Sequence, residues 1–131
     1  QQVERKWRCV SDSASAHYNR IVDMSKVEKD WKEAEKMRRN DERYRLVLNV
    51  DHNATSEGTP QPGGGSCIFL HVWHEGKPTI GCTAMPLERL QALLSWLRPE
   101  SKPHLVALPR ASYRSLQGVW KLPTAPIATA P

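Results

Sequence analysis

Residues 66–85, SCIFLHVWHEGKPTIGCTAM, combine the strongest strand pattern of the chain with a histidine and a cysteine of potential chemical use. Between residues 67 and 74, β-branched and aromatic side chains follow one another closely, which predicts a strand buried on both faces. His71 lies in the middle of that strand. The turn residues that follow allow the chain to fold back and bring Cys82 near His71. The stretch therefore predicts a Cys/His pair on a β scaffold.

A Cys/His pair at this spacing has a chemical and a structural interpretation. A neighbouring imidazole can take the proton of a thiol and leave a nucleophilic thiolate. Gly81 lets the backbone approach a substrate closely, so the amides of Gly81 and Cys82 would donate to an oxyanion. In the structural interpretation, Cys82 is a core residue and His71 is a hydrogen-bonded strand histidine. The spacing alone does not decide between the two.

A longer pattern favours the chemical interpretation. HVWHEGKPTIGCTAM, with GGGSCIFL before it and VDHN at residues 50–53, resembles the YkuD-type L,D-transpeptidases of bacterial cell walls. The resemblance extends over about residues 7–108. The signature of that family is a strand histidine, a loop, and then Ser/Thr-His-Gly-Cys. The matching positions here are His71, Thr79, Gly81 and Cys82.

Two positions and one length depart from the family pattern. Ile80 stands where the motif has a histidine, and Val72 stands where many members have a serine after the base. The intervening loop is also shorter than usual. The nucleophile and the base are retained, so the departures indicate a divergent branch.

The resemblance implies a peptidoglycan L,D-transpeptidase that crosslinks or trims stem peptides through a thioacyl intermediate. Cys82 would be the nucleophile and His71 the base, while Gly81, Thr79 and Thr83 would form the oxyanion site or position the substrate. No cofactor is expected, and the implied location is the bacterial periplasm or cell envelope. The alternative is a non-catalytic, wall-binding or structural remnant of such a domain.

We expect an α+β domain that is mainly β with two helices, over residues 1–108, followed by a flexible Pro/Ala-rich tail over residues 109–131. The resemblance implies a β-sandwich or barrel-like catalytic domain. Members of the family have further strands upstream, so this domain is expected to be incomplete, with an open sheet edge. A chain of 131 residues with 39% hydrophobic content supports one modest core.

Local patterns predict the elements around the central strand. Ser25 and Glu28 match a capping box and predict a helix that ends near Arg39. Residues 46–51 alternate as a half-buried strand does. Pro86 is suited to the start of a second helix with a leucine-rich face, which Pro99 ends. Residues 105–108 predict a last short strand.

His52 and Asn53 follow the strand predicted at residues 46–51. They would either cap the turn there or line the cleft, and the resemblance favours the cleft. The next residues, 54–65, form a loop by composition, and we expect a flexible lip beside the site. Neither GxGxxG nor GK[ST] is present, so nucleotide binding is not expected.

The chain has three cysteines. In an oxidising compartment an odd count suggests one pair and one free thiol. With Cys82 taken as the free one, Cys9 and Cys67 would either form a disulfide or remain two buried thiols.

The net charge of +5 is compatible with several partners. The basic residues are mixed with acidic ones and lack an accompanying series of aromatic residues, so nucleic acid is not an expected partner. No apolar run is long enough for an integral membrane segment. A zinc site built from His52, His71, His74 and Cys82 is a rival interpretation, but its spacing does not fit a compact site and no metal is expected. The oligomeric state is left open.

Overall fold

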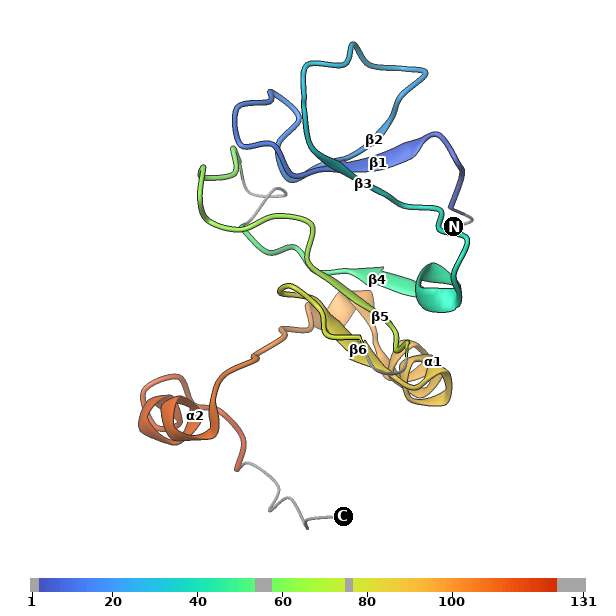
Figure 1. The fold of residues 1–131 in the computed structure, drawn as a ribbon. Coiled ribbons are helices and arrows are strands. Elements are labelled where there is room, and N and C mark those ends of the chain that lie inside the picture. Colours follow the sequence, from blue (N-terminus) through green and yellow to red (C-terminus); the bar gives the residue numbers. More distant parts are fainter. Residues whose placement is uncertain (1–2, 54–57, 75–76, 125–131) are drawn as a thin grey trace. The chain divides into compact units, whose positions relative to one another are not determined.

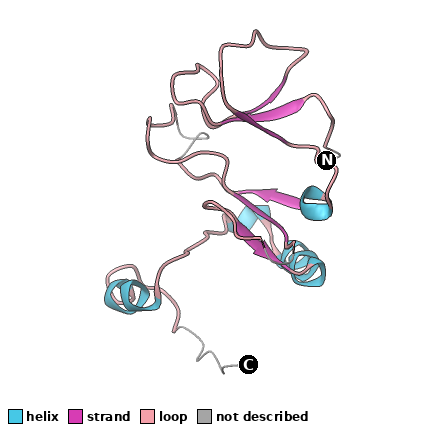
Figure 2. Cartoon of the chain, in the orientation of Figure 1, coloured by secondary structure: helices cyan, strands magenta, loops and turns pink. Residues whose placement is uncertain are grey.

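The computed structural model describes residues 3–53, 58–74 and 77–124. The chain divides into two compact units, Gln1–Arg98 and Pro99–Pro131, which are treated separately. The first unit contains the candidate site and, among the described residues, all the strands. Its elements are β1 (Trp7–Val10), β2 (Ile21–Asp23), β3 (Ala34–Lys36), the 3₁₀ turn η1 (Glu42–Tyr44), β4 (Val47–Asn49), β5 (Phe69–Val72), β6 (Thr83–Met85) and helix α1 (Leu87–Trp96) (Figures 1 and 2).

The first sheet has the strand order β2-β1-β3, with both neighbours antiparallel to β1. Val10 of the central strand is fully buried and packs with Val22 and Trp31. Trp31 lies in the irregular connection before β3. One large aromatic side chain therefore anchors a segment that has no regular structure of its own.

The second sheet has the order β4-β5-β6, with β5 buried at every position. Because strand side chains alternate between faces, Phe69 and Leu70 point in opposite directions. Phe69 joins a cluster with Met37 and Tyr44, whereas Leu70 packs against Leu90 of α1. The predicted strand, buried on both faces, is confirmed.

A disulfide between Cys9 and Cys67 links β1 to the residues just before β5, with the two Cα atoms 5.9 Å apart. Of the two alternatives that the sequence left open for Cys9 and Cys67, the structure has the disulfide, and Cys82 is the free cysteine. Both bonded cysteines are buried in the same cluster as Phe69. The bond therefore joins the segments of the two sheets through a shared core.

The helix predicted from Ser25 to about Arg39 is wrong. Residues 24–27 form turns, and β3 occupies part of the range instead. Ser25 donates from both its amide and its hydroxyl to Asp23, so it organises a local turn and does not cap a helix. The strand predicted at residues 46–51 is confirmed as β4, and the leucine-rich helix is confirmed as α1.

The fold class is α+β, with two helices and two small, mostly antiparallel sheets. The six strands within the described residues do not close into a barrel. One pairing differs from a simple fold-back, because β6 runs parallel to β5. Among the described residues, no helix has the length and apolar character that a membrane span requires.

The second unit contains η2 (Pro99–Ser101) and helix α2 (Arg110–Leu116). The strand predicted at residues 105–108 is wrong, because these residues have no regular structure and are mostly exposed. The expected tail begins with a helix, and the hydroxyl of Tyr113 donates to the carbonyl of Pro123 at 2.8 Å. The rest of the tail, residues 125–131, lies outside the described residues.

Candidate active site

Cys82 and His71 line the same pocket of the first unit, which has a volume of about 310 Å³. They reach it because Cys82 immediately precedes β6, which pairs in parallel with the strand that carries His71. Other walls come from the first sheet, from η1 and from the loop before Cys82. The lining residues are Ser11, Glu35, Arg39, Arg43, Tyr44, Ser66, Cys67, His71, Pro78, Thr79, Ile80 and Cys82.

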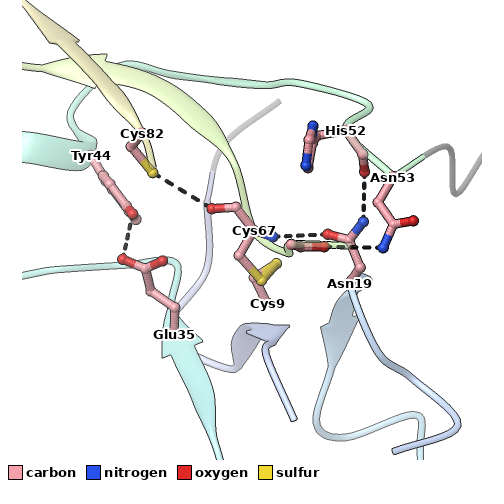
Figure 3. Close-up of a disulfide and its surroundings, with 9 residues drawn as sticks. Cys9, Asn19, Glu35, Tyr44, His52, Asn53, Cys67 and Cys82 are labelled. Atoms are coloured by element: carbon pink, nitrogen blue, oxygen red, sulfur yellow. Dashed lines mark hydrogen bonds between the residues drawn. A yellow bond between two sulfur atoms is a disulfide. The ribbon is translucent and has the colours of Figure 1, made fainter. Parts of the chain in front are cut away.

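The thiol of Cys82 is partly buried and is held by the backbone. Its Sγ lies 3.6 Å from the carbonyl oxygen of Cys67, to which the thiol donates (Figure 3). Burial raises the pKa of the Cys82 thiol, the Phe69 amide lowers it in part, and the negative charge of Glu35 raises it again. The expected low pKa of a preformed ion pair is therefore not found. The proton of Cys82 has to leave when the nucleophile reacts.

The ring of His71 is 5% exposed and has a fixed orientation. Its Nδ1 lies 2.8 Å from the carbonyl oxygen of Val72, which can only accept, so Nδ1 carries the proton. In the uncharged form of the ring, this tautomer has its lone pair on Nε2. Tyr44 packs edge-on against the imidazole, with ring centroids 5.4 Å apart. This arrangement sets the tautomer that a general base needs.

The loop before Cys82 is shaped by Thr79 and Gly81. The hydroxyl of Thr79 donates to the carbonyl of Cys82 at 2.6 Å, which closes the loop on itself. Gly81 has a φ of +85°, and a Cβ there would lie 2.9 Å from the end of the Ile68 side chain. Ile80, at the position of the family histidine, is fully exposed.

The remaining predicted positioning residue, Thr83, does not line the pocket. It is an exposed residue of β6 and pairs with Leu70. Strand alternation places its side chain on the face opposite that of Cys82. A role for Thr83 in holding an oxyanion therefore receives no support from the geometry.

Sequence reasoning missed three side chains that line the pocket together with Cys82, namely Tyr44, Glu35 and Arg39. The hydroxyl of Tyr44 donates to Glu35 at 2.5 Å (Figure 3). Burial, followed by this contact with Glu35, raises the pKa of Tyr44, so its hydroxyl stays protonated. Arg39 lies over the Tyr44 ring at 5.5 Å and pairs with Glu35 at 3.7 Å. Sequence reasoning did not bring Glu35 and Arg39 to Tyr44, because it placed both as partners on the exposed side of the predicted helix.

His52 and Asn53 do not line this pocket. His52 Nε2 contacts the carbonyl of Gly64 at 2.8 Å, and the Asn53 amide donates to the carbonyls of Gln61 and Gly65. Asn19 bonds to the carbonyl of His52 (Figure 3). His52 and Asn53 thus hold residues 61–65, at the end of the loop predicted at residues 54–65. The structure favours the interpretation in which they cap the turn over the one in which they line the cleft.

The zinc interpretation finds no support in residues 3–53, 58–74 and 77–124. No group of three His, Cys, Asp or Glu side chains is close enough there to bind a metal ion. Comparisons with models of protein families, with curated proteins and with solved structures each return no match for this chain. What this protein does is therefore inferred from the pocket itself and from the motif around Cys82.

Proposed function

We propose that this protein is a cysteine acyltransferase that acts on peptidoglycan stem peptides, as an L,D-transpeptidase or an L,D-carboxypeptidase. The observation that carries the proposal is that His71 and Cys82 line one pocket, next to a loop closed by Thr79. The resemblance of residues 71–85 to L,D-transpeptidases supports the same chemistry and supplies the substrate class. It also suggests the finer fold, a divergent member of the family's sandwich-like domain.

The reaction would begin at the carbonyl of the third stem residue. His71 Nε2 takes the thiol proton as Cys82 Sγ forms a bond to the carbonyl carbon. The tetrahedral intermediate then collapses, the bond to D-alanine breaks, and the proton passes from His71 to the leaving amine. A thioester on Cys82 remains, which an amine of a second stem or a water molecule cleaves.

Charge develops on the carbonyl oxygen during the attack, and donors near Gly81 would stabilise it. Positive φ at Gly81 sets the direction of the adjoining peptide groups, and the Thr79 bond holds the following carbonyl. Preorganised amides of this kind contribute about 2.7–4 kcal/mol each to acyl transfer. The Tyr44 hydroxyl donates its proton to Glu35, so it is not counted among the donors to the oxyanion.

The structural alternative also has an observation in its favour. The thiol of Cys82 donates to Cys67 and has a raised pKa, as a packed core cysteine does. In that case the pocket would hold no reacting group. The two interpretations predict different outcomes when substrate is added. Only a nucleophilic Cys82 forms a covalent product with the substrate.

The test is release of D-alanine from a purified tetrapeptide stem. The parent should release D-alanine, Cys82→Ser should release none, and His71→Gln should be slower by about 100-fold or more. His74→Gln is the matched control, because His74 is an exposed histidine outside the pocket. Equal release of D-alanine by Cys82→Ser and by the parent would refute the assignment of Cys82 as the nucleophile.

A further inference from the structure

A second pocket of the first unit is strongly basic and has no role in the proposed chemistry. It has a volume of about 670 Å³ and borders β1, β3 and the turn after β3. Five of its lining residues are basic and one is acidic. The lining consists of Arg5, Arg8, Lys36, Arg38, Arg39, Asn40 and Asp41. We call these seven residues the basic pocket.

The positive charge of the basic pocket is not neutralised by its own carboxylate. Asp41 is already held by Arg39, with Nε 3.0 Å from Oδ1 and Nη2 3.0 Å from Oδ2. Arg43 competes for the same carboxylate at 3.5 Å. Within the described part of the chain, the ion pairs found include none of Arg5, Arg8, Lys36 and Arg38. Four cations of the basic pocket therefore have no ion-pair partner among the described residues.

Strand register brings two of these cations together. Arg8 of β1 lies directly opposite Lys36 of β3 in the antiparallel ladder. Like charges in opposed positions destabilise a sheet. The Arg8 side chain is also fixed, since its Nη1 donates to the carbonyls of Arg5 and Trp7 at 2.7 and 2.9 Å. A bound anion would remove the repulsion and use cations that are already in place.

The donor set fits a phosphate group better than a carboxylate. One guanidinium satisfies one carboxylate, as Arg39 does for Asp41, whereas a phosphate group offers three oxygens and up to two charges. The lining also contains no aromatic side chain on which a nucleic-acid base could stack. We propose that the basic pocket binds a phosphate group, either of a free phosphate compound or of a phosphate polymer. This proposal stands independently of acyl transfer at Cys82.

The test follows backbone amide shifts of the full chain during titration with inorganic pyrophosphate. Shifts should concentrate at residues 36–41 and at Arg8. Arg38→Gln and Lys36→Gln should each weaken binding by about 10-fold, because each removes one charge-assisted contact to the anion. Both side chains are exposed and unpaired in the described structure, so neither change should disturb folding. Lys29→Gln, an exposed lysine outside the pocket, is the matched control and should bind as the parent does.

Two further probes identify the source of the phosphate and the anion type. Tighter binding of an inorganic polyphosphate chain than of pyrophosphate would assign the pocket to a polymer, and the reverse order would assign it to a small compound. Pentaglutamate should bind much more weakly than either. Equal binding of pentaglutamate, equal weakening by Lys29→Gln and Arg38→Gln, or shifts spread over all basic residues would overturn the proposal.

Discussion

Reduction of the Cys9–Cys67 disulfide should remove a large part of the stability of this protein. The two cysteines are 58 residues apart in sequence, and closing a loop of that length in the unfolded chain corresponds to ~4 kcal/mol in the chain-entropy treatment. Domains of this size have total stabilities of about 5–15 kcal/mol. The first unit buries only short strands and one helix, so we expect a marginal reduced state.

The assay is urea unfolding of oxidised and reduced protein at about pH 7, both carrying Cys82→Ala so that no third thiol can exchange. The free energy of unfolding should fall by about 3–4 kcal/mol on reduction. A Cys9→Ala/Cys67→Ala variant is the control and should not respond to reductant. A fall of less than ~1 kcal/mol would mean that the disulfide does not constrain the unfolded chain as reasoned here.

Three further predictions concern charge, backbone and thiol. Lys36→Glu should stabilise the protein by roughly 0.2–1 kcal/mol, because it turns the like-charge pair with Arg8 into an opposite-charge pair. The gain should shrink in ~1 M salt, and thermal unfolding that is unchanged at low salt would contradict this prediction. Gly81→Ala should cost about 1–2 kcal/mol, because φ is +85° there; urea unfolding that matches the parent would exclude the strain. The rate of Cys82 alkylation by iodoacetamide should rise about tenfold per pH unit between about pH 7 and 9, because the pKa of the thiol is raised and the thiolate fraction grows with pH. A rate that is flat over that range would show a preformed thiolate.

Sequence reasoning correctly predicted the elements whose hydrophobic periodicity is set by residues close together in the chain. The apolar run of β5 and the leucine face of α1 each specify an element by their own periodicity. The odd cysteine count and the choice of Cys82 as the free thiol left Cys9 and Cys67 either as a disulfide or as two buried thiols, and the structure has the disulfide. In each case, few competing arrangements were available.

The failures occur where distant groups outcompete local propensity. Residues 25–39 have good helical spacing, yet the carboxylate of Asp12 accepts the Lys32 amide, and Asp30 accepts from Ser15 and Ala16. The burial of Trp31 and the pairing of β3 with β1 complete the alternative. No pattern within those residues indicates the hydrogen-bond partners, since Asp12, Ser15 and Ala16 lie 14 to 20 positions away.

The candidate site was predicted in its two central residues and missed in its surroundings. His71 and Cys82 line one pocket because β5 and β6 run parallel, whereas a simple fold-back was expected. Tyr44 belongs to η1, an element of only three residues. Glu35 belongs to β3, which lies where a helix was predicted. The raised pKa of Cys82 follows from that enclosure, which a linear motif does not contain.

The most direct test of the account is the mass of the intact protein after exposure to a carbapenem, a class of acylating agent to which the resemblance implies sensitivity. The folded parent should gain one adduct, located on the peptide that contains Cys82. Cys82→Ala should gain none, His71→Gln should react at least about 100-fold more slowly, and His74→Gln should react as the parent does. A parent that stays unmodified, or an adduct that forms equally in Cys82→Ala, would contradict the assignment of Cys82 as an acyl-accepting nucleophile.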